Sequence, residues 1–301
     1  MKTTITIIGL SAIFAGFALL AQEAKLAAAS GAARAQEYDW TSSGAHASVI
    51  RDGIQFNNNR WAGEQGTMFV KFGPPTVTWW TTHSGKRRDF PVSASNAAIG
   101  RNWGTQTSAN IPLPAKLADI EYLRVSLTAT LATNPSHMYR VCWQTYLADS
   151  PTGKFNGDFA PTIYWQNCPD NWWGRPKGVF EIDGRKWQYN DCDQAVGRYC
   201  VPTLAPKLQP DKNGKIEMYD VDFKPLFDKA VELGFYTDQK YLMTIHASWE
   251  VWILDEDLTM NDMCFVIKVK GKPELTVPSW SQLPSRSRSA QELPPVAKEE
   301  P

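Results

Sequence analysis

One carboxylate in this chain lies in a setting that suits acid/base chemistry. Glu250 belongs to the segment 241–269, which reads YLMTIHASWEVWILDEDLTMNDMCFVIKV. Its first half alternates, so Glu250 shares a face with His246 and Trp252 while mainly apolar residues take the other face. The turn at 254–257 predicts a hairpin, which would hold Glu250 near a strand end with a fixed orientation. A carboxylate among aromatic rings suits a general acid, although a solvated strand carboxylate would show the same pattern.

Two further segments carry side chains that suit sugar binding. The stretch 53–63 reads GIQFNNNRWAG, in which Asn59 offers a donor and an acceptor to hydroxyl groups and Trp61 offers a flat ring. An Asn-rich turn followed by a core tryptophan is the alternative. The alternating run 67–82 places Trp79 and Trp80 on opposite faces, and we assign Trp80 to a groove. Thirteen tryptophans in all suit a carbohydrate cleft or a large sandwich core.

These segments resemble glycoside hydrolase family 12. The pattern Tyr-Leu-x-x-Ile-x-Ala-x-x-Glu-x-Trp at 241–252 is similar to the acid/base segment of that family, and the order of segments over 54–270 is also similar. Members of that family are secreted endo-β-1,4-glucanases and xyloglucanases. The resemblance implies that this chain is also secreted and folds as an all-β jelly roll of two curved antiparallel sheets with one packed helix. It implies that Glu250 is the general acid/base and that Asn59, Trp61 and Trp165 bind glucosyl units. Ala62 stands where the family usually has glycine.

The middle of the chain departs from the family pattern. Alignment on Trp165 puts Pro161, or Ala160, where the family has its nucleophilic glutamate, and alignment on Tyr146 and Leu147 puts Gln144 where it has an aspartate. Retaining hydrolysis needs two carboxyl groups about 5–5.5 Å apart, whereas inverting hydrolysis uses about 6.5–9.5 Å. Asp158 is our candidate for the second carboxylate. We also assign His246 and Trp252 to substrate binding, since they share the face of Glu250.

The remaining patterns set the domain organisation. An apolar run at 5–21 before Ala33-Arg34-Ala35 predicts a signal peptide over 1–35, with an uncleaved anchor as the alternative. A jelly-roll domain is expected over 36–272, and the Pro- and Ser-rich stretch 273–301 predicts a flexible tail. One helix is predicted after Asp222, with Gly234 as its stop. The mature protein would be secreted or periplasmic and monomeric, with no stable membrane span.

Charge and cysteine content narrow the ligand classes. The 31 basic and 31 acidic residues balance, which argues against a nucleic-acid partner. Cys192 and Cys200 flank a short polar loop in a chain expected to be exported, and we predict a disulfide between them. The sequence has no CxxC or HxxxH spacing of the kind that binds zinc, so we expect neither a metal site nor a cofactor.

Three hypotheses about function follow. The first is a glycoside hydrolase that acts on β-1,4-glucan (cellulose, xyloglucan or mixed-linkage β-glucan). The second is a polysaccharide-binding protein that keeps the cleft without the chemistry. The third is a structural envelope protein on the same fold. The distance between Glu250 and a second carboxyl group would separate the first from the others.

Overall fold

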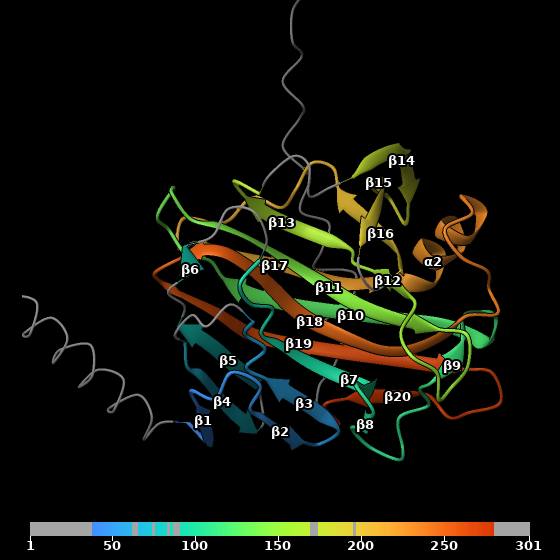
Figure 1. Cartoon of the computed structure of the whole chain (residues 1–301), viewed down its shortest axis with the longest axis horizontal. Coiled ribbons are helices and arrows are strands. Elements are labelled where there is room, and N and C mark those ends of the chain that lie inside the picture. The colour runs from blue at the N-terminus through green and yellow to red at the C-terminus, as the bar shows by residue number, and fades with distance from the viewer. Residues whose placement is uncertain are drawn as a thin grey trace, which may run out of the picture.

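In the part of the chain that the structure describes, two β-sheets stack face to face and an α-helix lies at one side (Figure 1). The computed structural model describes residues 38–61, 66–73, 76–82, 85–86, 91–168, 174–194 and 197–279. The predicted signal peptide lies outside the described residues, as does the chain after Ser279. The all-β jelly-roll prediction is confirmed, and the described fold extends to Ser279, past the predicted boundary at 272.

The smaller sheet has seven strands, and β19 lies at its centre. Its strands, in spatial order, are β1 (Trp40–Ser42), β4 (Met68–Gly73), β5 (Thr76–Thr82), β19 (Asp257–Val269), β10 (Ile120–Thr130) and β17 (Lys215–Asp222), with β20 (Leu275–Val277) also paired to β19.

The larger sheet has thirteen strands, and it carries Glu250 on its strand β18. The main path, in spatial order, is β14 (Arg175–Ile182), β15 (Arg185–Gln194), β16 (Gly197–Leu204), β12 (Gly157–Phe159), β11 (Met138–Ala148), β18 (Tyr241–Leu254), β7 (Asn96–Asn102), β3 (Ile54–Asn57) and β2 (Ser48–Arg51). Four short strands lie off this path: β13 (Thr162–Gln166), β6 (Gly85–Lys86), β8 (Thr105–Gln106) and β9 (Ala115–Lys116).

The predicted hairpin is the centre of the molecule. Strand β18 lies between β11 and β7 in one sheet, and β19 lies between β5 and β10 in the other (Figure 1). The core between the sheets contains Ile245, Ala247, Trp249 and Val251, as the alternation predicts. At the start of β18 this alternation shifts by one residue, so that Leu242 rather than Met243 joins the core, where the pairing with β11 changes register.

The helix that the sequence predicts after Asp222 is present. Helix α2 (Phe223–Glu232) begins after Asp222, whose side chain accepts a hydrogen bond from the Lys224 amide. Its apolar face joins the core, since the Phe223 ring lies 5.4 Å from that of Trp143 and the Phe227 ring 4.5 Å from that of Phe159. A short 3₁₀ helix, η1 (Leu117–Asp119), precedes β10.

The predicted Cys192–Cys200 disulfide is wrong. In the β15–β16 hairpin Cys192 pairs with Tyr199, so its neighbour Cys200 points to the opposite face of the sheet. Cys200 lies in the main core, whereas Cys192 packs in a separate cluster with Ala160 and Tyr199. No disulfide joins the two residues. A short separation in sequence therefore does not bring two strand cysteines to one face.

No helix in the described ranges is both long and apolar enough to cross a membrane.

Candidate functional site

Glu250 forms a buried ion pair with an arginine on the neighbouring strand. Arg140 of β11 lies directly opposite Glu250 of β18 in the strand pairing. The Arg140 Nε and Nη2 atoms lie 2.9 and 2.8 Å from Glu250 Oε2. Arg140 is fully buried and Glu250 is 3% exposed, so the alternative of a solvated carboxylate is wrong. In this arrangement Glu250 accepts hydrogen bonds, whereas a general acid must donate a proton.

Two hydroxyl groups complete the surroundings of the guanidinium. Arg140 Nη2 also donates to the Tyr199 hydroxyl, and Nη1 lies 3.4 Å from Thr162 Oγ1. Both partners come from strands on the side of β11 away from Glu250. The guanidinium is therefore held from both sides, which fixes the orientation of Glu250.

Asp158 lies on the same outward face, which we call the site face of the larger sheet. Its Oδ2 accepts a hydrogen bond of 3.0 Å from Gln144 Nε2, while its Oδ1 is buried without a partner in the described part of the chain. Burial raises the pKa of Asp158 well above its usual range, the Gln144 hydrogen bond opposes this shift, and the charge of Glu250 adds to it. Burial therefore favours the protonated, neutral form of the Asp158 carboxyl group.

The strand register separates the two carboxyl groups. Asp158 lies opposite Tyr146 on β11, whereas Glu250 lies opposite Arg140. Six residues of strand correspond to about 20 Å of backbone. The residue directly across β11 from the Glu250 row is Trp165, not a carboxylate. The backbone therefore does not place Asp158 in the row where a second carboxylate would face Glu250.

His246 is buried between these groups. It lies opposite Gln144, and its ring makes an edge contact with Tyr146 at 5.4 Å. Burial lowers the pKa of His246 to about 3, so the ring is neutral, and neither nitrogen has a hydrogen-bond partner in the described part of the protein. A neutral imidazole offers one donor and one acceptor to a polar ligand or a water molecule.

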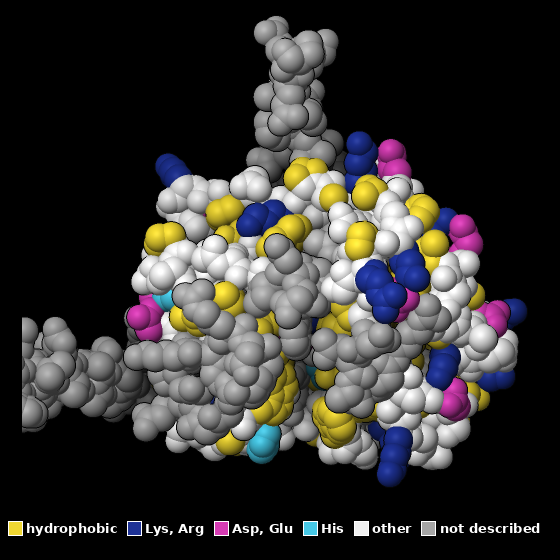
Figure 2. All heavy atoms as spheres, turned by 45° about the horizontal axis from the view of Figure 1, so that its top comes forward, with side chains coloured by type: hydrophobic (Ala, Val, Ile, Leu, Met, Phe, Trp, Pro, Cys, Tyr) yellow, Lys and Arg dark blue, Asp and Glu magenta, His cyan; other side chains and the backbone are white. Residues whose placement is uncertain are grey.

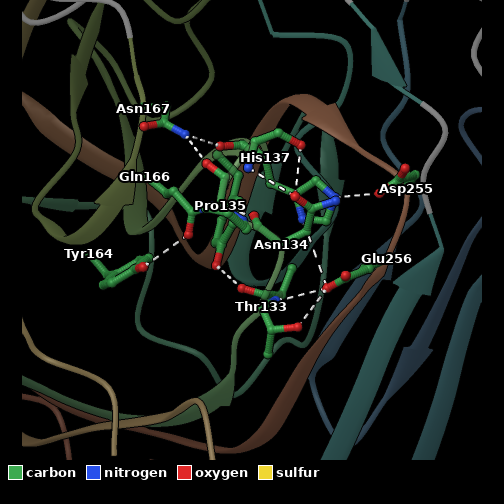
Figure 3. Close-up of polar contacts among 12 residues, drawn as sticks. Thr133, Asn134, Pro135, His137, Tyr164, Gln166, Asn167, Asp255 and Glu256 are labelled. Carbon is green, nitrogen blue, oxygen red and sulfur yellow. Dashed lines mark hydrogen bonds and ion pairs between the residues drawn. The ribbon is translucent and has the colours of Figure 1, made fainter.

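A polar framework holds the ends of the strands that carry Arg140 and Glu250 (Figure 3). The loop before β11 reaches the β18–β19 turn through His137, which bonds to Asp255, and through the Thr133 amide, 2.8 Å from Glu256 Oε2. It reaches the end of β13 through Gln166 Nε2, 2.7 Å from the Asn134 carbonyl oxygen. The turns beside the ion pair are thereby tied together.

The other predicted sugar-binding residues lie at different depths. Trp252 is fully buried on the site face, and the partly buried Trp165 packs against the same cluster. Asn59 and Trp61 follow β3; Trp61 is 46% exposed, and its amide lies 2.9 Å from the Val92 carbonyl oxygen. The backbone of Trp80 lies in β5 of the smaller sheet, away from the strands that carry Glu250, and its side chain lies outside the described residues.

Sequence reasoning missed Arg140 and Tyr199. The signal for Arg140 was present, because it stands in the alternating run 138–148 among residues that a central strand buries. A buried arginine needs a carboxylate partner, so this position pointed to a pairing that only the register could identify.

The architecture was compared with known proteins. No family model matches the sequence, and no curated protein matches it. Solved structures do match. A metagenome-derived family 12 endoglucanase superposes with a TM-score of 0.67 at 18% identity, covering 77% of this chain and 98% of that one. The chain has the fold of glycoside hydrolase family 12.

Two further structures of this fold show its range. The endoglucanase Cel12A of Rhodothermus marinus matches with a TM-score of 0.66 and 16% identity, over 76% of this chain and 99% of that one. A family 12 xyloglucanase of Bacillus licheniformis matches with a TM-score of 0.62 and 12% identity, over 76% and 100%. This chain thus shares the fold of these family 12 structures at 12–18% sequence identity.

On this fold the site face combines a buried carboxyl group with a raised pKa, an ion-paired carboxylate and several aromatic rings. Within the described ranges no cluster of three or more His, Cys, Asp or Glu side chains could hold a metal ion. The chemistry available from these side chains is proton transfer, hydrogen bonding and ring stacking.

Proposed function

We propose that this protein binds β-1,4-linked glucan chains along the site face. The observation that carries the proposal is the family 12 fold combined with an exposed Trp61 at the edge of the strands that hold Glu250. An exposed indole offers a stacking surface to a sugar ring. The basic and acidic side chains visible in Figure 2 are dispersed rather than gathered in one patch, which suits an uncharged ligand. We also propose that the chain is exported, as its predicted signal peptide indicates.

Hydrolysis of the bound chain is the second candidate function. The observation that favours it is the difference between the two carboxyl groups, because a neutral Asp158 can act as a general acid while Glu250 acts as a base. This assignment reverses the role that the sequence suggests for Glu250. Either mechanism needs the two carboxyl groups within about 10 Å of each other, so hydrolysis requires that their side chains converge across the roughly 20 Å of strand that separates their rows.

Binding is tested by titration of the purified protein with cello-oligosaccharides and xyloglucan oligosaccharides. Trp61→Ala is expected to weaken binding by about 1–3 kcal/mol, the scale of one lost aromatic contact. Val179→Ala is the control, because Val179 is also exposed but lies on β14 at the other end of the sheet. Absence of binding by the native protein would overturn the proposal and favour a structural envelope role.

Hydrolysis is tested on the same samples by release of reducing sugar from a panel of β-glucans. Release that disappears in both Glu250→Gln and Asp158→Asn would establish the second candidate. Retention on an affinity gel without release would support binding alone.

A further inference from the structure

A second exposed tryptophan lies at the far end of the site face. Trp103 is 65% exposed, the largest value among the exposed large hydrophobic residues described. It occupies the tip of the β7–β8 hairpin, where Asn102 pairs with Thr105. Trp61 lies near the opposite end of β7. Its amide bonds to Val92, just before β7 begins, and the next residue, Ser93, bridges to Val251 of β18.

The backbone at Trp103 is strained for such a large residue. The two turn residues, Trp103 and Gly104, have φ values of 46° and 90°. A two-residue hairpin turn with both φ values positive favours Asn-Gly or Asp-Gly, and a bulky residue there carries a local energetic cost. Strain of this kind is commonly found where a side chain has a functional role.

The Trp103 ring is supported from beneath. It makes edge contacts with Phe155 at 4.9 Å and with Tyr146 at 5.6 Å, and the Tyr146 and Phe155 rings stack at 4.8 Å with planes 6° apart. We call these three residues the aromatic shelf. The contacts fix the indole while most of its surface stays open, which is what a stacking platform for a sugar ring needs.

Buried polar atoms border the shelf. Tyr146 contacts the His246 ring and lies opposite Asp158 in the strand pairing. The His246 nitrogens and Asp158 Oδ1 have no partner in the described part of the chain. Because these atoms are buried, a link between them and sugar hydroxyl groups on the shelf runs through a bridging water.

We propose that the aromatic shelf is a second subsite for the glucan chain, with Trp103 as its platform. This inference rests on the proposed function. From Ser93, which bridges to Val251, to Gly100, which pairs with Thr244, the chain runs seven residues into and along β7, or about 23 Å. A chain that contacts both tryptophans therefore has several sugar units and passes over the rows of Glu250 and Gln144.

The test is a titration of the full protein with cello-oligosaccharides from two to six units, comparing native protein, Trp103→Asn, Trp103→Ala and Val179→Ala. Asparagine suits the turn, so Trp103→Asn should unfold at the same temperature as native protein or above it. Its affinity for the hexasaccharide should fall about threefold to tenfold, and the native gain in affinity with ligand length should shrink.

The outcomes separate the two proposals. If native protein binds the oligosaccharides and Trp61→Ala weakens binding, but Trp103→Asn and Trp103→Ala match Val179→Ala at every length, the shelf is not a subsite and the proposed function stands. If native protein binds no oligosaccharide, both proposals fail together.

Discussion

Arg140 determines what Glu250 can do. A carboxylate that shares two short contacts with a buried guanidinium is stabilised as an ion pair, and both groups depend on each other because each would otherwise be buried alone. The contribution of this pair to stability can be measured apart from any activity.

We expect Arg140→Met to lower the free energy of unfolding by about 3–5 kcal/mol, because Glu250 would remain buried without its partner. The double variant Arg140→Met/Glu250→Met should be closer to native stability than Arg140→Met. Urea unfolding of native protein, Arg140→Met, Glu250→Met and the double variant measures the coupling. Additive effects of the two substitutions would show that the pair is not energetically coupled.

His246 makes stability depend on pH. Its pKa falls from about 6.5 in the unfolded chain to about 3 in the fold, so the unfolded state binds a proton first as the pH drops. The contribution of neutral His246 to the free energy of unfolding is therefore fully present above about pH 6.5 and is lost as the pH falls toward 3. The raised pKa of Asp158 acts in the opposite direction, since its contribution is greatest at low pH.

Chemical unfolding of native protein and His246→Phe between pH 4 and 7 isolates the histidine. The difference in unfolding free energy between the two proteins should change with pH by up to about 1.4 kcal/mol per unit, with native protein losing more stability at low pH. Parallel curves for the two proteins would contradict a neutral, buried His246.

At the scale of single elements, α2 depends on its first turn. Asp222 Oδ1 accepts hydrogen bonds from the Lys224 amide at 2.9 Å and from the Leu123 amide at 3.1 Å, so it caps the helix and joins it to β10. Asp222→Ala should cost about 1–2 kcal/mol in thermal or urea unfolding. The exposed Asp228 is the control, since Asp228→Ala removes only a surface pair with Lys224 and should cost less than about 0.5 kcal/mol.

Individual strands and helices were easier to predict from the sequence than the side-chain contacts between them. Alternation revealed β18, and the capping pattern revealed α2, because these signals lie within ten or so neighbouring residues. The Arg140–Glu250 contact joins positions 110 apart, and its register is not written in either segment alone. The disulfide prediction failed for the same reason, since Cys192 and Cys200 are close in sequence but face opposite sides of one hairpin.

At the scale of the whole molecule, the last described residues tie the two sheets together. Strand β20 pairs with β19 of the smaller sheet and buries Val277. Two residues later, the Ser279 amide and hydroxyl lie 2.8 and 2.9 Å from Asp52 Oδ2, in the β2–β3 turn of the larger sheet. The segment 273–279 therefore belongs to the fold.

Truncation separates this segment from the residues beyond it. A chain that ends at Gly271 should be about 1–3 kcal/mol less stable than one that ends at Ser279, because it lacks the burial of Val277 and the Asp52 contacts. Differential scanning calorimetry measures both. Equal midpoints for the two truncated chains would show that β20 adds no stability.

The position of β18 and β19 also constrains how the chain folds. The two central strands lie late in the sequence, at Tyr241–Leu254 and Asp257–Val269. Until they emerge from the ribosome, β11, β7, β10 and β5 have open edges that can pair with other chains. At about 5–20 residues per second, synthesis of the preceding chain takes roughly tens of seconds. For that time the edges of these four strands lack their native partners, and neither sheet can close until the hairpin arrives.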